Sequence, residues 1–336
     1  MGGRHGGMAG LDVDGDVFTV GMSRSGTTWL ARALNRHPEI AVFGESAFWG
    51  RKHVPPAEEA YAAEECREVE RAHDGRMSVN DVAPELGGPS AVVRSATGEA
   101  AEEAEPVGPG ELYRRVCARV GRAEGARIVV EKTPHHVLWV DRIEKHVPGA
   151  RFLVCVRDPR GFLRSYKHQG ERKPPPVRET FEDLYHPVVT ALVARQYLRA
   201  IRSVLDTRPD RTRMVRLEEI EDDPDGVLRD VQRFLGVEVR AGLDRGTENT
   251  SFPGAEERPE LDPAELFWLD VVAGRASEAL GYPRRSPRPV RLRWIVPLLT
   301  LPVALLRVLS VVRGATVSDL GAYLRGWIAA GDSETP

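Results

Sequence analysis

The stretch of residues 17–29, VFTVGMSRSGTTW, constrains the fold of this chain more than any other. Its first four residues are apolar or β-branched, as in a buried parallel strand. Gly21 ends this strand, a polar turn follows, and the pattern from Thr27 onward predicts a helix with an apolar face formed by Trp29, Leu30, Ala33 and Leu34. A strand, a glycine turn and a helix form a cradle for an anion, because backbone N–H groups converge at the helix N-terminus.

The spacing of this turn is close to that of a Walker A loop, but the loop lysine is missing. Glycines stand at 21 and 26, Thr27 occupies the place of the lysine, and the cation, Arg24, lies three residues earlier. The missing lysine argues against ATP as a phosphoryl donor. An arginine in the turn can instead hold a terminal oxyanion group with its planar fork of donors. The alternative is a strand–turn–helix of small residues with no ligand.

Composition limits the class of protein. The chain has 336 residues, of which 41% are hydrophobic and 29% charged, as in a soluble globular protein with a sizeable core. A net charge of −3 gives no reason to expect a nucleic-acid partner. Cys66, Cys117 and Cys155 are few, odd in number and far apart, which indicates a reducing cytoplasm and no metal site. Residues 1–15 lack an apolar signal region and are expected to form a flexible tail.

A carboxylate follows the second predicted strand, residues 40–43. Gly44 and Glu45 come directly after this strand. In open α/β sheets, ligand chemistry gathers at the carboxyl ends of the strands, so Glu45 is a candidate general base. The alternative is that Glu45 caps the next helix or only contacts water.

The middle of the chain separates this first part from the next strands. Residues 51–125 are rich in Glu, Ala, Gly and Pro and predict a helical, acidic insertion that ends in a solvated loop. We expect one domain over residues 16–285, which includes this insertion. A basic and apolar helical segment over residues 286–336 then follows it.

Two further strands end in charged residues. A strand over 127–131 is followed by Lys132, and Thr133 with Pro134 predicts the N-cap and first residue of a helix. The alternative for Lys132 is an ordinary surface lysine.

The apolar strand over 152–156 is followed by Arg157, Asp158 and Pro159, with Ser165 about two turns along the predicted helix. A guanidinium and a hydroxyl placed in this way can hold a second phosphate. In the alternative, Arg157 and Asp158 form a salt bridge that locks the turn.

Together these motifs resemble those of sulfotransferases that use 3′-phosphoadenylyl sulfate (PAPS). Residues 21–29 resemble the 5′-phosphosulfate loop of that family, and residues 154–165 are similar to its 3′-phosphate motif. Weaker similarity continues through residues 213–236, with Asp-Pro at 223–224 and Phe-Leu-Gly at 234–236. The resemblance implies a three-layer, P-loop-like α/β fold with a central parallel sheet flanked by helices.

The resemblance also implies roles for the residues of the first motif. Arg24 would contact the 5′-phosphosulfate, where many members of the family have lysine. The loop that cradles this group would consist of Ser25, Gly26, Thr27 and Thr28. Trp29 falls where a family tryptophan stacks on adenine, and the alternative is that Trp29 belongs to the core.

The other implied contacts come from later in the chain. Arg157 and Ser165 would bind the 3′-phosphate that distinguishes PAPS from ATP. Lys132 falls at the position of a lysine that steadies the transferring sulfuryl group. A late loop, residues 247–254, would close over the nucleotide.

The position of the base divides the family. Small-molecule sulfotransferases of the cytosol carry Lys-Thr-His with the histidine as base, but this chain has Pro134 there. Tyrosine-sulfating and Golgi-type enzymes use a glutamate after the first helix, in a His-Pro…Gly-Glu setting that resembles residues 37–45. We therefore predict Glu45 as the base, with His135 in reserve. Only Arg51 matches the arginines that follow this glutamate in tyrosine-sulfating enzymes, which argues against a peptide acceptor.

The predicted reaction is sulfuryl transfer from PAPS to a hydroxyl of a small-molecule, glycan or lipid-like acceptor. Such a transfer needs in-line positioning and stabilisation of oxyanion charge, supplied by Arg24 and Lys132, and requires no metal. The alternatives are a P-loop nucleotide kinase and a non-catalytic protein that binds nucleotide or associates with a membrane. High arginine, alanine and glycine with few lysines indicates a bacterial source with a GC-rich genome.

The C-terminal part, residues 284–312, has an unusual pattern. Arginines at 284, 285, 288, 291 and 293 precede an apolar run over 294–306 that contains two prolines. The run is shorter than the roughly 20 residues of a spanning helix. Two interpretations stay open: a segment that lies on anionic lipid, and a helix packed on the domain or at a homodimer seam.

Overall fold

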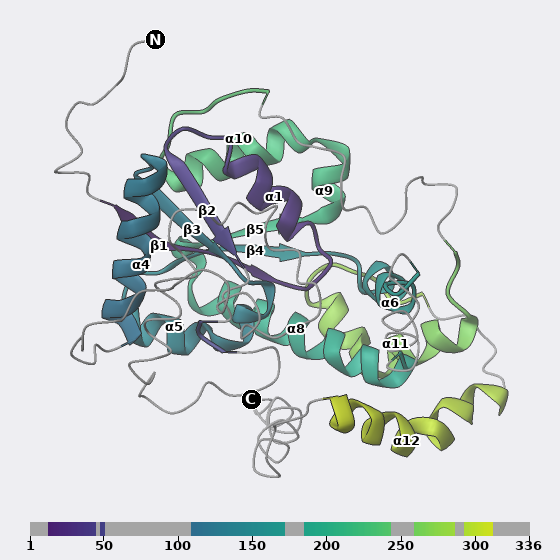
Figure 1. Ribbon diagram of the computed structural model, residues 1–336. Coiled ribbons are helices and arrows are strands. Elements are labelled where there is room, and N and C mark those ends of the chain that lie inside the picture. The colour runs from purple at the N-terminus through teal and green to yellow at the C-terminus, as the bar shows by residue number, and fades with distance from the viewer. Residues whose placement is uncertain are drawn as a thin grey trace.

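A five-stranded parallel sheet forms the centre of the protein (Figure 1). The computed structural model describes residues 13–44, 48–50, 109–171, 185–242, 259–285 and 292–311. The strands are β1 (Asp14–Gly21), β2 (Ile40–Gly44), β3 (Ile128–Lys132), β4 (Arg151–Val156) and β5 (Thr212–Arg216). Their order is β2-β3-β1-β4-β5, and each neighbouring pair is parallel.

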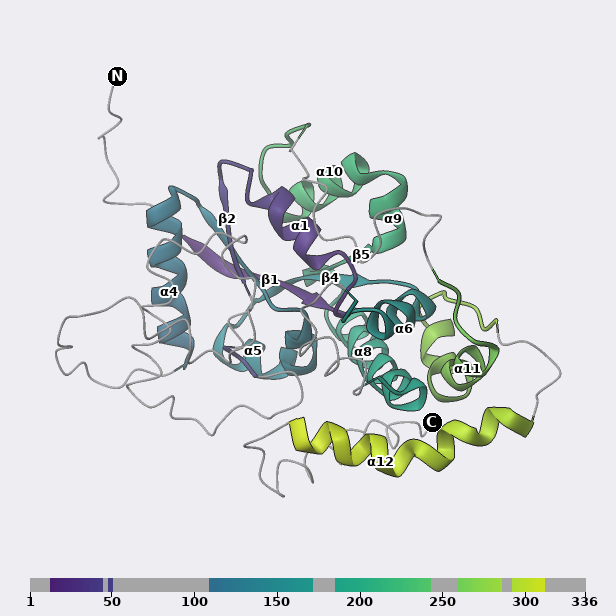
Figure 2. The same ribbon diagram turned by 45° about the vertical axis from the view of Figure 1, so that its right-hand side comes forward.

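Helices cover both faces of this sheet, which confirms the predicted three-layer α/β fold (Figure 2). One face carries α1 (Thr27–Leu34), α9 (Leu217–Asp222) and α10 (Pro224–Leu235). The other carries α4 (Pro109–Glu124), α5 (Val140–His146), α8 (Pro187–Thr207) and α11 (Pro263–Glu278). The remaining elements are the short helices η1 (Pro134–Trp139), η2 (Pro209–Arg211) and η4 (Leu292–Ile295), together with α6 (Pro159–Lys167) and α12 (Val296–Val311).

The two faces of the sheet bury separate apolar cores. Successive side chains of a strand point to opposite faces, so Phe18 and Phe152 join the core beneath α4 and α8, whereas Val17 and Leu153 join the core beneath α1 and α10. Because both faces are covered, the strands can be apolar along their whole length. This explains the buried apolar or β-branched runs over 17–20 in β1 and 152–156 in β4.

Some boundaries differ from the predictions. β1 begins at Asp14, inside the predicted tail, and residues 1–12 and 51–108 lie outside the described residues. The end of the predicted insertion forms α4, which packs on the sheet because Tyr113, Val116 and Val120 fall on one helical face and are buried.

The two predicted helix starts have different outcomes. The Asp158 carboxylate accepts a hydrogen bond from the backbone N–H of Arg160, so Asp158 caps α6 as predicted. Thr133 takes the predicted N-cap position and Pro134 begins the helix, but the Thr133 side chain makes no capping hydrogen bond. Its hydroxyl donates to the carboxylate of Glu131, and the helix that begins at Pro134 is the 3₁₀ helix η1. A hydrogen bond to a buried carboxylate is stronger than one between neutral groups.

The connections of the strands define where a ligand can bind. After β1 the chain crosses to β2 at one edge of the sheet, and after β4 it continues to β5 at the other edge. Neighbouring strands whose connections leave in opposite directions create a crevice at their carboxyl ends. The fold therefore places this crevice between Gly21, at the end of β1, and Arg157, which follows β4.

Candidate active site

The loop that follows β1 has a tightly specified backbone. A Cβ at Gly21 would lie 2.0 Å from the carbonyl oxygen of Cys155, and Met22 donates its N–H to that same oxygen at 2.9 Å. Gly26 begins α1 with φ of 85°. Arg24 has φ of 66°, and among the described residues it is the one non-glycine residue with positive φ. A left-handed arginine is held by its surroundings at a conformational cost, which is typical of a binding loop.

The two predicted phosphate motifs meet at this loop. Nε of Arg24 donates to the hydroxyl oxygen of Ser165 at 3.0 Å, 141 residues further along the chain. Nη1 of Arg157 donates to the backbone carbonyl of Arg24 at 2.7 Å. The Ser23 hydroxyl lies 3.2 Å from the hydroxyl of Tyr197 on α8. The carboxyl ends of β1 and β4 therefore form a single site that combines the predicted residues Arg24, Arg157 and Ser165.

Burial dominates the electrostatics of Arg157. Burial lowers the pKa of its guanidinium to about 10, and this is the largest of several influences on that pKa. The carboxylates of Glu218 and Glu221 raise the pKa, and the guanidinium groups of Arg164 and Arg24 lower it. Nε of Arg157 is buried and has no hydrogen-bond partner among the described residues.

The predicted alternative for Arg157, a salt bridge to Asp158, is wrong. The Asp158 carboxylate pairs with Arg160 instead, because it caps the helix on which Arg160 lies. The backbone N–H of Asp158 donates to Oε1 of Glu218 at 2.7 Å, and the hydroxyl of Tyr282 donates to Oε2 of Glu218 at 3.0 Å. Glu218 therefore holds the turn that carries Arg157.

Sequence reasoning missed Glu218 and also missed Gly161. A Cβ at Gly161 would lie 2.7 Å from Nη2 and 2.9 Å from Nε of Arg157, so the guanidinium packs directly on this glycine. The sequence signal for Gly161 was its place in the first turns of a predicted helix. Glycine destabilises a helix there, so its presence indicates that another group approaches closely.

The helix that starts at the loop buries the residues next to it. Thr27 is buried, whereas Thr28 and Trp29 are half-buried. The Ser25 hydroxyl donates to the backbone carbonyl of Met22, within the loop. Trp29 packs against the core beneath α1 and α10, which agrees with its assignment to the core, and its stacking on adenine stays a prediction.

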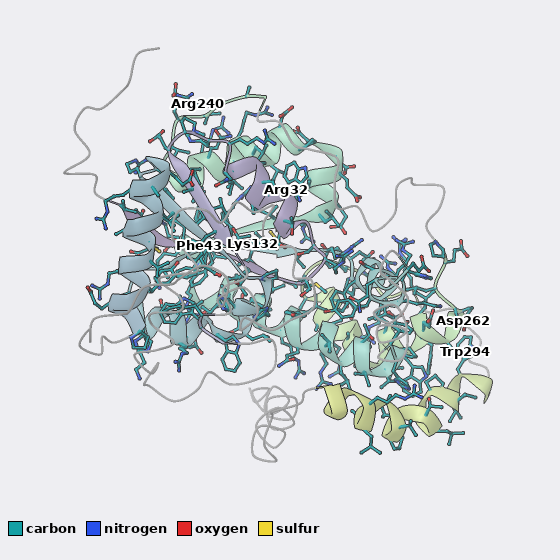
Figure 3. The ribbon with its side chains drawn as sticks, in the orientation of Figure 1. Arg32, Phe43, Lys132, Arg240, Asp262 and Trp294 are labelled. Atoms are coloured by element: carbon teal, nitrogen blue, oxygen red, sulfur yellow. The ribbon has the colours of Figure 1, made fainter. Side chains whose placement is uncertain are left out.

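Lys132 ends β3 beside this site, near the centre of the molecule (Figure 3). In the sheet it is paired with Thr19 of β1 and with Gly44 of β2, and a Cβ at Gly44 would lie 3.0 Å from Cε of Lys132. Its exposure is 4%, so the alternative of an ordinary surface lysine is wrong. A buried cation at the carboxyl end of a central strand points to a functional role.

The neighbouring Glu131 lies on the opposite face of β3 and belongs to a buried pair that sequence reasoning missed. Oε2 of Glu131 lies 3.0 Å from Nδ1 of His136, and both side chains are 0% exposed. Nε2 of His136 accepts from the backbone N–H of Trp49 at 3.3 Å, so the ring proton is assigned to Nδ1 and faces Glu131. Nε2 of His135 lies 3.1 Å from the carbonyl of Gly50. Both histidines thus attach residues 48–50 to the end of β3.

Glu45, the predicted base, lies outside the described residues, as does the loop 247–254. Gly44, its neighbour in the chain, ends β2 directly beside Lys132. Within the described part of the chain, no group of three or more His, Cys, Asp or Glu side chains could hold a metal ion.

The sheet order and the loop after β1 define an α/β protein of P-loop-like architecture with a candidate anion site at the β1–β4 crevice. The family model described as "Sulfotransferase family" matches residues 16–241, and the chain belongs to this family. The match begins within β1 and ends beyond α10, so it contains the predicted catalytic and nucleotide-binding residues but not the loop 247–254.

Curated relatives are similar over part of their length. Nodulation protein NoeE of Sinorhizobium fredii is 26% identical over 246 residues, which is 70% of this chain and 53% of NoeE. Omega-hydroxy-beta-dihydromenaquinone-9 sulfotransferase Stf3 of Mycobacterium tuberculosis is 27% identical over 187 residues, which is 50% of this chain and 44% of Stf3. The chain spans about half the length of the curated relatives it matches.

Solved structures with a similar arrangement are also sulfotransferases. The sulfotransferase from Alicyclobacillus acidocaldarius is 19% identical with a TM-score of 0.49, over 80% of this chain and 94% of that one. The sulfotransferase domain of the curacin biosynthetic pathway is 16% identical with a TM-score of 0.47, over 86% of this chain and 98% of that domain. Because both scores are below 0.5, the fold assignment rests on the strand order itself.

Proposed function

We propose that this protein transfers a sulfuryl group from PAPS to a hydroxyl group of its acceptor. The observation that supports this most strongly is the meeting of Arg157 and Ser165 with Arg24 at one crevice. A donor with phosphate groups at both its 5′ and 3′ positions needs cations at two places. The loop arginine and the arginine after β4 supply them.

The residues of the site fit this donor chemically. Nε of Arg157 is buried without a partner among the described residues and can donate to a 3′-phosphate oxygen, beside the hydroxyl of Ser165. The backbone of the loop and the N-terminus of α1 favour the 5′-phosphosulfate. Ser25, Gly26, Thr27 and Thr28 are the residues that would cradle it.

The proposed reaction is an in-line displacement at sulfur. The acceptor oxygen forms a bond to sulfur, the bond from sulfur to the bridging 5′-phosphate oxygen breaks, and adenosine 3′,5′-bisphosphate leaves. Glu45, within ~3 Å of the acceptor hydroxyl, takes its proton as the new bond forms. Lys132 and Arg24 stabilise the charge that grows on the leaving 5′-phosphate.

For the acceptor we propose a hydroxylated lipid-like molecule, with other small molecules and glycans as the alternatives. The support is the relative Stf3, whose name gives a hydroxylated dihydromenaquinone as its substrate. The C-terminal apolar segment of this chain is a second reason to expect an apolar acceptor.

The donor is tested by calorimetric binding of adenosine 3′,5′-bisphosphate and of ADP. We expect the wild type to prefer the bisphosphate, and Arg157→Ala to weaken that binding by about 10- to 100-fold, because a charge-assisted contact contributes about 1.5–3 kcal/mol. Arg151→Ala is the matched control, because Arg151 begins the strand that Arg157 follows and pairs with Asp14 at the opposite edge. Preference for ADP would contradict the proposal and favour a nucleotide kinase.

The base is tested separately with Glu45→Gln and a hydroxylated quinone or other candidate acceptor. We expect bisphosphate binding to be unchanged and turnover to fall by about 10²–10⁴-fold, the range that a positioned general base contributes. Full turnover in Glu45→Gln together with its loss in His135→Ala would transfer the role of base to His135. Binding without turnover of any acceptor would favour a non-catalytic nucleotide-binding protein.

A further inference from the structure

The exposed apolar side chains of this protein are concentrated on its last described helix. In the described part of the chain, eight large apolar side chains are exposed, and six of them lie on η4 and α12: Ile295, Val296, Leu298, Leu299, Val303 and Leu306. We call these six residues the α12 face. Leu299, Val303 and Leu306 are spaced four and three residues apart, which places them on one side of the helix. Leu299 is 76% exposed and Leu306 65% exposed.

The opposite side of this helix is attached to the domain. The indole N–H of Trp268 on α11 donates to the carbonyl of Trp294 at 2.6 Å, and the rings of Phe267 and Trp294 lie 5.4 Å apart. His186, which caps α8, has Nε2 at 3.0 Å from the carbonyl of Pro297 and 3.1 Å from the hydroxyl of Thr300. Trp294 itself is buried (Figure 3).

These contacts fix the orientation of α12, which runs along one side of the molecule beneath α8 and α11 (Figure 2). Pro297, Leu301, Ala304 and Leu305 on the side toward the domain are half-buried, whereas the residues of the α12 face are exposed. The predicted packing of this helix on the domain is thus seen for one side of α12. Its other side is apolar and exposed.

The charge of the surrounding sequence is strongly one-sided. Residues 283–318 contain seven arginines and no aspartate, glutamate or lysine, although the whole chain has a net charge of −3. In the described part of the chain, no helix is long and apolar enough to cross a membrane. An apolar helical face within a basic stretch of sequence is the pattern of a segment that lies in the plane of an interface.

We propose that the α12 face docks onto the surface of an anionic lipid bilayer. The arginines of residues 283–318 attract acidic headgroups, and the α12 face enters the boundary of the acyl chains. A second copy of the chain is disfavoured as the occupant, because a two-fold symmetric contact would bring this basic segment against itself. This proposal does not depend on the donor or on sulfuryl transfer.

The docked surface is connected to the candidate site through α8. This helix begins beside α12 at His186 and carries Tyr197, whose hydroxyl contacts Ser23 in the loop after β1. Docking on a bilayer would therefore place the β1–β4 crevice at a fixed orientation to the lipid, which suits an acceptor that resides there.

The proposal is tested by co-sedimentation of the full chain with vesicles of phosphatidylcholine that contain phosphatidylglycerol, and with vesicles of phosphatidylcholine alone. The test variant is Leu299→Glu with Leu306→Glu. The matched control is Val239→Glu with Val271→Glu, because these two exposed valines lie outside the α12 face. We expect the wild type and the control to bind the anionic vesicles, and the test variant to bind about tenfold or more weakly.

Binding of the wild type is also expected to weaken on vesicles without phosphatidylglycerol and at high salt, since charge attraction contributes. The proposal is overturned if the wild type stays in the supernatant, or if the test variant binds as well as the control. It is also overturned if the wild type is a dimer that the test variant alone converts to a monomer and neither binds vesicles. The same variants should bind adenosine 3′,5′-bisphosphate as the wild type does. This measurement separates a failure of membrane docking from a failure of the proposed donor.

Discussion

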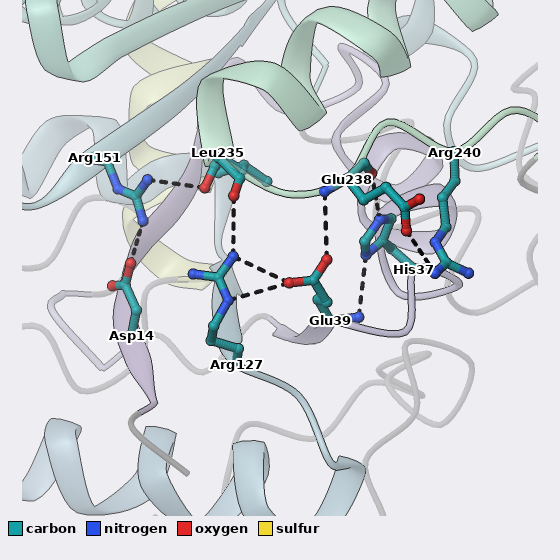
Figure 4. A network of polar contacts seen from close by, with 9 residues as sticks. Asp14, His37, Glu39, Arg127, Arg151, Leu235, Glu238 and Arg240 are labelled. Atoms are coloured by element: carbon teal, nitrogen blue, oxygen red, sulfur yellow. Dashed lines mark hydrogen bonds and ion pairs between the residues drawn. The ribbon is translucent and has the colours of Figure 1, made fainter.

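The two edges of the sheet handle their charged residues in opposite ways. At the amino edge, charges neutralise one another (Figure 4). Arg151 pairs with Asp14, Arg127 donates to Glu39 at 3.2 Å, and that same arginine reaches the carbonyl of Gly236 at 3.1 Å. Arg151 and Arg127 each have a carboxylate in direct contact, so both offer little to a further anion.

At the carboxyl edge the arginines contact neutral oxygens. Arg24 donates to the hydroxyl of Ser165 and Arg157 to a backbone carbonyl, while Nε of Arg157 has no partner among the described residues. These contacts are with neutral oxygens, and the carboxylates of Glu218 and Glu221 also act on the charge of Arg157. The two edges therefore differ in how their arginines are held, although charged residues are present at both.

The buried pair Glu131–His136 is the exception at the carboxyl edge, and its removal should have the largest effect. Glu131→Ala would leave the Nδ1 proton of His136 and the hydroxyl of Thr133 without an acceptor at a site with no exposure. We expect the free energy of unfolding to fall by about 3–5 kcal/mol, measured by thermal or denaturant unfolding. Glu131→Gln, which keeps an acceptor oxygen, should lose less. Unchanged stability with lost turnover would instead place the pair in the reaction.

Lys132, the next residue along β3, should give the contrasting result. Lys132→Ala removes a buried cation beside Gly44 and is expected to lower kcat by about 10²–10³-fold, the typical effect of losing one group that stabilises transition-state charge. Binding of adenosine 3′,5′-bisphosphate should change little. Equal losses of binding and of turnover would mean that Lys132 holds the nucleotide in the ground state.

Gly161 tests whether the position of the Arg157 guanidinium decides nucleotide affinity. Gly161→Ala would push a methyl group against Nη2 and Nε of Arg157. We expect bisphosphate affinity to fall by about three- to tenfold, as when one hydrogen bond is lost, while thermal stability holds or rises because alanine is the better helix former. In the background of Arg157→Ala the same substitution should have no further effect on affinity. An additive loss in the double variant would contradict the contact.

The smallest effect is expected at the amino edge, from Glu144 on α5. Burial raises the pKa of Glu144, but hydrogen bonds from Arg211 and Arg208 outweigh it, and the net shift is downward. A lowered pKa in the folded state stabilises the protein above the unfolded pKa, and this contribution is lost as the pH falls through the folded pKa. Glu144→Gln should therefore cost about 0.5–1 kcal/mol at neutral pH and nothing in strong acid, measured by urea unfolding at several pH values. Bisphosphate affinity should be the same in both proteins.

Much of the fold was predictable because local sequence and tertiary structure agree. The apolar runs of β1, β3 and β4, the Asp158–Pro159 helix start and the loop at Gly21 each specify their own conformation. Thr133 takes the N-cap position, but its side chain does not cap the helix and donates instead to a buried carboxylate two residues earlier. No pattern local to residue 133 shows that Glu131 is buried.

The site was only partly predictable for a similar reason. Residues at strand ends were found because parallel strands bring their carboxyl ends together. Glu218, Gly161 and the Glu131–His136 pair were missed, since each acts through a partner that the sequence does not place beside it.

The elements and the chemistry they carry follow from local sequence: a strand, a glycine turn and a helix, and cations at the ends of strands. The meeting of Arg24, Arg157 and Ser165, and the outward position of the apolar residues of α12, follow from the folded arrangement. The difference lies in the range of the interactions. Backbone propensity and periodicity act over a few residues, whereas the partnering of a charge and the burial of a face depend on segments that folding alone brings together.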